Sequence, residues 1–196
     1  MQFFTVRTTQ NGEHRIHRQF GGRGFYGPFR FRVAPDPTVE RVAVDAQAAP
    51  DAVAFWAVLK FLPNINEGIQ EKLDLLAESG KHHCGIRVTL RDQKFHDVDT
   101  HSNGMKVEGV SFAHSTLERF TTPLSPLRAD WLTSDVVTLA RGIHADAAFD
   151  RLPILADALQ DAGCNDPLVI EHLQTCPDHA PSCWVVEMIL DQMARI

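Results

Sequence analysis

The chain has 196 residues, of which 44% are hydrophobic and 22% charged, with a formal net charge of −6. This composition is typical of a folded soluble protein of one or two domains. No apolar run approaches the ~20 residues of a membrane span, and the start, "MQFFTVRTTQ", lacks the pattern of a signal peptide. Four unevenly placed cysteines exclude a disulfide-stapled fold. We therefore expect a cytoplasmic protein with reduced thiols and no membrane partner.

Positive charge is concentrated at the N-terminal end. Residues 1–32 carry six arginines and one acid, whereas residues 121–196 carry four basic residues and eleven acids. A basic end attracts a polyanion, and an acidic remainder repels one. Contact with nucleic acid is therefore expected from one end of the fold only. The alternative is that exposed strands simply carry arginine on their solvated face.

The first part of the chain has the alternation of strands. The pair Asn11–Gly12 is a strong signal for a tight turn between the first two predicted strands. The alanine-rich run 52–59 is compatible with a strand or a helix. Period-two alternation predicts strands over residues 3–9, 13–20, 29–33 and 38–46.

Two helices and another strand follow. The spacing of apolar residues predicts a helix that begins at Pro63 and ends at Gly80. Alternation over 86–90 predicts a strand that leads into a polar tip. A second helix is expected from Ser102 to Phe120, although Gly104 and Gly109 weaken the prediction.

The rest of the chain divides into a linker and a helical module. Residues 121–129 contain two prolines and no periodicity, which is typical of a linker. Beyond them we expect helices, with an N-cap at Thr133 or Ser134 and a helix end at Gly163. The predicted organisation is a module over 1–120, a linker over 121–129 and an acidic helical module over 130–196.

Glycines at 22, 24 and 27 match the G-x-G-x-x-G pattern of dinucleotide-binding loops. That pattern binds a pyrophosphate only where the glycines follow a buried strand and open a helix. Here they are flanked by "GEHRIHRQF" and "FRFRV", which alternate like exposed strands. The sequence therefore predicts a strand, a glycine loop and a strand, with no nucleotide.

Three stretches carry a resemblance to a known family: "GEHRIHRQFGGRGFYG", "FLPNINEGIQEKL" and "GIRVTLRDQKFHDVDTHSNGMKVEG". In order and spacing they resemble domain IV of translation elongation factor G, over about residues 5–120. The resemblance implies an α+β fold, a two-layer mixed sheet backed by helices, with a left-handed βαβ crossover. The helical end is similar to a tail that closes many otherwise unrelated bacterial proteins, with no activity attached to it.

In elongation factor G this domain enters the ribosomal decoding centre and contacts RNA. Glycine lets a backbone approach phosphate closely, arginine supplies a forked donor, and a ring stacks on a base. Arg15 and Arg18 would flank the tip as basic residues. The implied RNA-binding and ribosome-binding tip is Gly21, Gly22, Arg23, Gly24, Phe25, Tyr26 and Gly27, with His96, Asp97, Val98 and Asp99.

Two departures from the family pattern limit the functions that we expect of this chain. The family's loop glutamine is Phe25 here, and no P-loop pattern of the G-x-x-x-x-G-K-[ST] kind occurs in the chain. We therefore expect a non-enzymatic ribosome-binding or RNA-binding module without GTPase activity and without a cofactor. The alternative is a protein-interaction module that keeps the scaffold, with a partner on the acidic C-terminal module.

Other chemistry stays open. One alternative is a metal-dependent hydrolase, because alternate side chains of an extended segment point the same way and could converge on a metal ion. The same acids also serve to shape a loop. The residues of this segment are His96, Asp97, Asp99 and His101. His82, His83 and Cys84 are more simply a polar turn before a strand. Spacings of three, two and three residues superficially suggest zinc at His172, Cys176, His179 and Cys183, but no metal site is expected.

Overall fold

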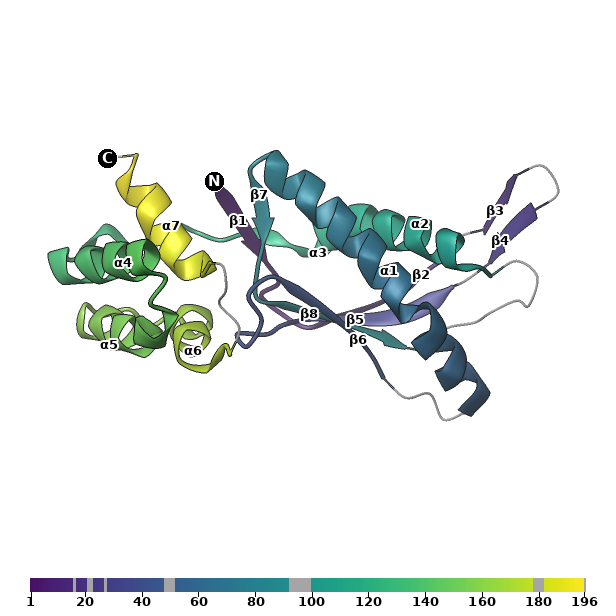
Figure 1. Ribbon diagram of the computed structural model, residues 1–196, viewed down its shortest axis with the longest axis horizontal. Helices are drawn as coiled ribbons and strands as arrows, with labels where there is room; N and C mark the ends of the chain where they lie inside the picture. The colour runs from purple at the N-terminus through teal and green to yellow at the C-terminus, as the bar shows by residue number, and fades with distance from the viewer. Residues whose placement is uncertain are drawn as a thin grey trace.

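The computed structural model describes residues 1–15, 17–20, 23–26, 28–47, 52–91, 100–177 and 182–195, with only the backbone described at 17–20, 23–26 and 52–58. A mixed sheet with long helices on one face makes up most of the molecule, and a group of shorter helices packs at one end of it (Figure 1). The expected α+β two-layer fold is confirmed. Within the described residues, none of the helices has the length and apolarity to cross a membrane.

The central sheet has four strands in the order β2 (Gln10–His14), β5 (Phe29–Pro35), β8 (Ile86–Arg91) and β6 (Val42–Ala46). β6 is parallel to β8, and the other pairs are antiparallel. Because strand side chains alternate between faces, each of the two central strands buries one apolar row. The sheet is mixed, as expected, and the left hand of its crossover stays a prediction.

One face of this sheet is covered by α1 (Ala52–Glu78) and α2 (Ser102–Phe112) (Figure 1). α2 continues through a π-helical turn (Ala113–Leu117) into α3 (Glu118–Phe120), so the second predicted helix is confirmed. The predicted start of the first helix at Pro63 is wrong, because α1 runs through this proline. Pro63 is exposed, so its ring meets solvent rather than the core. Gly80 ends the segment with a φ of +84°, as expected.

The predicted turn at Asn11–Gly12 is also wrong, because both residues lie inside β2. A Cβ at Gly12 would stand 2.4 Å from the Cζ of Phe31, so glycine is required there by the ring on the neighbouring strand. The hairpin that begins with β2 continues outward as β3 (His17–Phe20) and β4 (Arg23–Tyr26).

A small second sheet leads toward the helical module. β1 (Gln2–Thr5) lies between β7 (Lys81–His83), which is parallel to it, and the short antiparallel β9 (Thr122–Pro123). The interpretation of residues 82–84 as a polar turn is therefore wrong. His83 lies in β7 and is buried, and Cys84 after it is 1% exposed.

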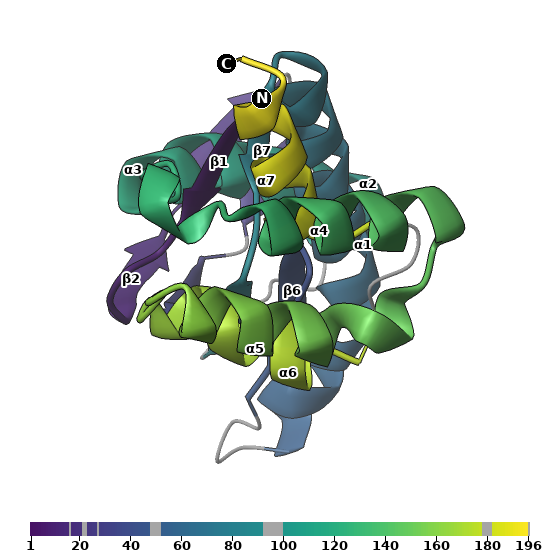
Figure 2. The same ribbon diagram turned by 90° about the vertical axis from the view of Figure 1, so that its left-hand side faces the viewer.

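Four helices form the C-terminal module: α4 (Ser134–Asp146), α5 (Leu152–Asp161), α6 (Pro167–Thr175) and α7 (Trp184–Met193). Short 3-10 turns precede α4 (Ala129–Trp131) and α5 (Phe149–Arg151). Thr133 caps α4 by accepting from the Val136 amide, as predicted. The core of this module also includes Phe3 and Cys84 from the first module, so the two modules pack against each other (Figure 2).

Candidate nucleic-acid interface

The predicted glycine loop belongs to one long antiparallel hairpin. His14 of β2 pairs with Phe29 of β5, and the same register continues through β3 and β4 to Phe20 opposite Arg23. Figure 1 shows β3 and β4 extending beyond the central sheet, at the end far from the C-terminal module. Strands lie on both sides of the glycine motif, as predicted, but Gly24 lies inside β4 rather than in a loop. Gly22 and Gly27 lie outside the described residues.

The described residues that flank the second predicted tip segment lie at the same end of the sheet. β8 ends at Arg91, which pairs with Arg30 near the start of β5. The chain is described again from Thr100, and α2 begins there at Ser102. His101 caps this helix, since its Nδ1 accepts from the Gly104 amide at 3.1 Å. Both candidate segments are therefore anchored at one end of the sheet.

The tip residues themselves are only partly within the described structure. Arg18 lies in β3, and Arg23, Gly24, Phe25 and Tyr26 form β4. Arg15 is exposed between β2 and β3, and its guanidinium bonds Glu13 at 2.8 Å. Its partner is thus a neighbour in the hairpin rather than an acid of the C-terminal module. The remaining predicted residues lie outside the described ones: Gly21, Gly22, Gly27, His96, Asp97, Val98 and Asp99.

A buried polar pair lies between the base of the hairpin and α2. His14 and Glu108 are 7% and 3% exposed, and 3.4 Å separates Nε2 from the Glu108 carboxylate. The His14 ring also contacts the rings of Phe29 and Phe112. Because these contacts join β2, β5 and α2, the hairpin leaves the sheet from a fixed base.

The open face of the central sheet carries arginines. Arg30 and Arg32 are exposed and alternate with the buried residues of β5, while Arg91 lies beside Arg30 on β8. We call Arg30, Arg32 and Arg91 the arginine face. On β2, the residues paired with Arg30 and Arg32 are Glu13 and Asn11. The arginine face therefore combines with Arg15 to give the tip end of the sheet a positive balance.

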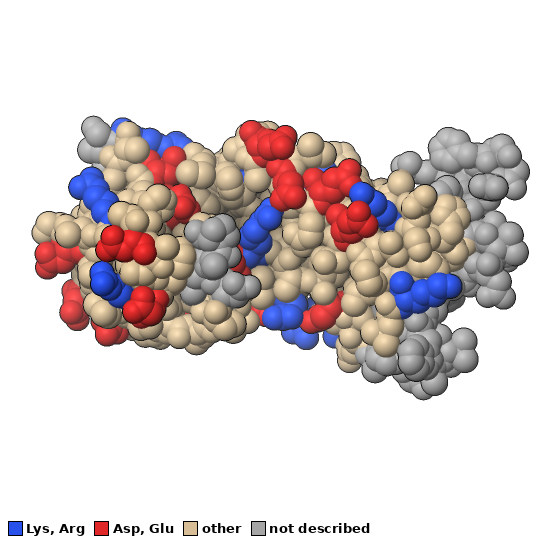
Figure 3. Space-filling view, in the orientation of Figure 1, with Lys and Arg blue, Asp and Glu red and all other residues tan. Residues whose placement is uncertain are grey.

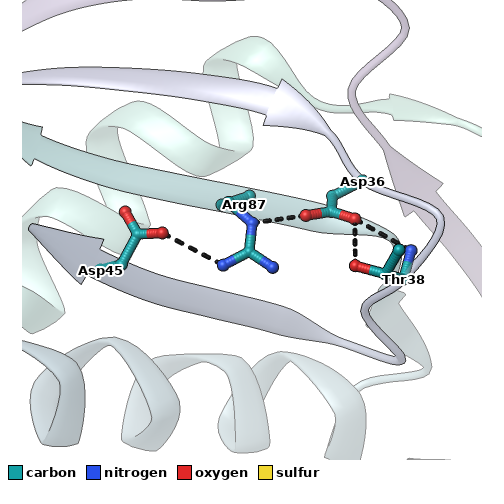
Figure 4. A network of polar contacts seen from close by, with 4 residues as sticks. All are labelled: Asp36, Thr38, Asp45 and Arg87. Atoms are coloured by element: carbon teal, nitrogen blue, oxygen red, sulfur yellow. Dashed lines mark hydrogen bonds and ion pairs between the residues drawn. The ribbon is translucent and has the colours of Figure 1, made fainter. Parts of the chain in front are cut away.

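Nearer the C-terminal module, acidic side chains neutralise the positive charge on the same face of the sheet. Arg87 on β8 bonds Asp36 and also Asp45, the latter at 3.1 Å (Figure 4). The hydrogen bond to Asp36 raises the pKa of Arg87 above its usual value. Thr38 donates its amide and its hydroxyl to Asp36, which fixes that carboxylate in place. Positive charge on this face consequently increases toward the hairpin.

The helices on the other face of the sheet carry mainly negative charge at their surface. Lys106 on α2 is paired with two α1 acids at 3.0 and 2.9 Å. Acidic groups lie over the helices in the space-filling view (Figure 3). A polyanion would therefore be repelled from this side. The exposed acids of α1 are Glu67, Glu71, Asp74 and Glu78.

The two alternative metal sites, the hydrolase segment and the zinc pattern, are each described only in part. Of the hydrolase segment only His101 is described, and its Nδ1 is engaged as a helix cap. His172 and Cys176 of the zinc pattern do come together, joined by Glu40, while His179 lies outside the described residues. Sequence spacing alone does not find Glu40, because it lies more than a hundred residues from either partner.

Comparison with known proteins gives a likeness of fold. No family model matches the chain. A crystallised protein from Thermus thermophilus is similar at 20% identity and a TM-score of 0.48. The match covers 64% of this chain and 18% of that protein, so this chain spans less than a fifth of its length. At this score the likeness says nothing about function.

Proposed function

We propose that this protein is a non-enzymatic RNA-binding module, directed at the ribosome or another structured RNA, and related to domain IV of elongation factor G. The observation that carries the proposal is that the β3–β4 hairpin and Arg91, the last described residue before 92–99, lie at one end of the sheet. The motif resemblance assigns RNA contact to both of these segments.

Charge supports the same end of the molecule. The arginine face and Arg15 lie beside the hairpin, whereas α1 and the C-terminal module carry an acidic excess. Phosphate contacts from arginine supply affinity independent of sequence, and glycines allow close backbone approach. RNA would lie against the hairpin and the open sheet face, while α1 and the acidic C-terminal module face away from it.

The test is a salt titration of full-length protein with ribosomes and with transfer RNA. Replacing Arg30 and Arg32 together by glutamine is expected to weaken binding roughly tenfold or more at low salt. The double variant should also reduce the slope of log K against log salt by about 2, because each lost phosphate contact releases about one counterion fewer. Arg23→Ala and His96→Ala test the tip of the hairpin and of the second segment.

The matched control removes two exposed arginines from the C-terminal module, Arg141→Gln with Arg151→Gln. Its net charge change is the same, so the proposal requires this control to bind like the wild type. Equal losses in both double variants would mean that only net charge matters. If the wild type binds neither ribosomes nor transfer RNA, the proposal falls, and the protein-interaction alternative takes its place.

A further inference from the structure

The seam between the two modules holds a buried cluster of metal-ligating side chains. Glu40 comes from the loop between β5 and β6, His172 from α6, and Cys176 directly follows α6. One ligand atom of each lies within 4.8 Å of the others. His172 is fully buried, and Cys176 is 9% exposed. The cluster therefore joins segments that are far apart in sequence and belong to different modules.

The histidine ring has a defined tautomer when it is neutral. Its Nδ1 lies 2.8 Å from the carbonyl oxygen of Pro37, which accepts hydrogen bonds only, so Nδ1 carries a proton. Nε2 then presents its lone pair, and it faces Oε2 of Glu40 at 3.0 Å. Two acceptors at this distance require a cation between them, either a proton or a metal ion.

The Glu40 carboxylate is fixed in place by a backbone amide of α7. Its other oxygen, Oε1, accepts the backbone N–H of Trp184 at 2.5 Å, in the first turn of α7. The exposed amides at a helix start favour a negative charge. Glu40 thus caps a helix of the other module and directs its second oxygen at the His172 ring.

Two more thiols lie close to this carboxylate. Cys84 and Cys183 are both 1% exposed. Burial, and after it the charge of Glu40, raises the pKa of each of these thiols. A buried thiolate is unfavourable without a cation, whereas a coordinated metal ion deprotonates a thiol outright. Neither Cys84 nor Cys183 is among the clustered ligand atoms, so the sulfur ligand of this site is Cys176.

We propose that Glu40 Oε2, His172 Nε2 and Cys176 Sγ bind a zinc ion that clamps the two modules together. Zinc takes thiolate, imidazole and carboxylate ligands in tetrahedral geometry. The Nδ1–H bond to Pro37 is the outer contact that commonly orients a zinc-bound histidine. A water molecule completes the set.

The distances fit with small adjustments. Bonds of ~2.1 Å to nitrogen and oxygen put those ligands roughly 3.4 Å apart around zinc, against 3.0 Å between Nε2 and Oε2 here. The thiol has to approach by about 1 Å at most, which a side-chain rotation supplies. A pocket of about 440 Å³ at the seam is lined by Glu40, Cys84 and Trp184, so solvent reaches the cluster on the Glu40 side.

The test uses the full chain, stripped with a chelator and titrated with zinc against a chromogenic competitor. We expect one zinc ion per chain. We also expect a thiolate-to-metal charge-transfer band when cobalt replaces zinc. Cys176→Ser should weaken zinc binding by about tenfold or more and remove this band. His172→Gln should weaken binding as strongly.

Cys164→Ser is the matched control, because Cys164 is also buried in the C-terminal core but is not among the clustered ligands. It should bind zinc like the wild type, and zinc should raise the thermal midpoint of both proteins by more than that of Cys176→Ser at the same zinc concentration. The proposal fails if the stripped wild type takes up neither zinc nor cobalt, which needs no variant to fold. It also fails if Cys176→Ser binds as tightly as the wild type.

Discussion

His83 shows how one residue is placed by its hydrogen-bond partners. The Thr121 hydroxyl donates to the Leu117 carbonyl at 2.7 Å, so its oxygen accepts from Nε2 of His83. Nδ1 of His83 is buried and has no hydrogen-bond partner among the described residues. A proton there would be an unsatisfied buried charge, and burial lowers the pKa of His83 to about 4. The sequence "KHHC" shows two histidines but not which one is buried.

This pKa predicts a loss of stability in acid. The unfolded histidine has a pKa of about 6.5, above that of the folded state, so the unfolded state binds more protons between these values. The free energy of unfolding should therefore fall as the pH falls from about 6.5 to about 4, by up to roughly 3 kcal/mol. Urea unfolding of the wild type at several pH values measures this decrease.

His83→Phe removes the titrating group and should flatten this part of the pH profile. The control is His114→Gln, at an exposed histidine beside Glu118, which should leave the decrease in place. A His83→Phe profile as steep as that of the wild type between these pH values would contradict the account.

Helices α1 and α2 show why element boundaries were harder to predict than element types. Apolar spacing predicts both helices, yet α1 starts well before Pro63, because the run 52–59, which is compatible with a strand or a helix, is helical. Gly109, which weakened the prediction of α2, is required by packing. A Cβ there would lie 2.1 Å from the Ile65 carbonyl oxygen, and one at Gly68 would lie 2.0 Å from that of Lys106. Helical propensity contains no information on such a contact.

Gly109→Ala should therefore destabilise the protein, although alanine favours helices. Overpacking of this kind costs about 1–3 kcal/mol, and more where the clash is with backbone. Gly142→Ala in α4 is the matched control, since a Cβ there meets nothing within 4 Å. It should stabilise the protein by up to about 1 kcal/mol. Urea midpoints of both variants measure this contrast, and a Gly109→Ala variant at least as stable as the wild type would refute the close helix contact.

The whole molecule is an elongated arrangement in which the β3–β4 hairpin and the C-terminal module lie at opposite ends (Figure 1). Both termini lie at the helical end, where the Met1 amino group contacts Asp191 at 2.9 Å and Arg195 donates to the Met1 carbonyl. The strand alternation, the mixed sheet and the helical module follow from the sequence. The seam does not, because Glu40 and His172 are 132 residues apart in the sequence and meet only in the folded chain.

On the proposed function, we expect RNA to contact the hairpin end and not the helical end. The most direct measurement is photo-crosslinking of the full-length protein to thiouridine-labelled RNA, followed by mass spectrometry of the crosslinked peptides. We predict crosslinks within residues 10–35 and 91–101, lost together as salt is raised. Crosslinks concentrated on α4 to α7, or spread evenly along the chain, would contradict this account.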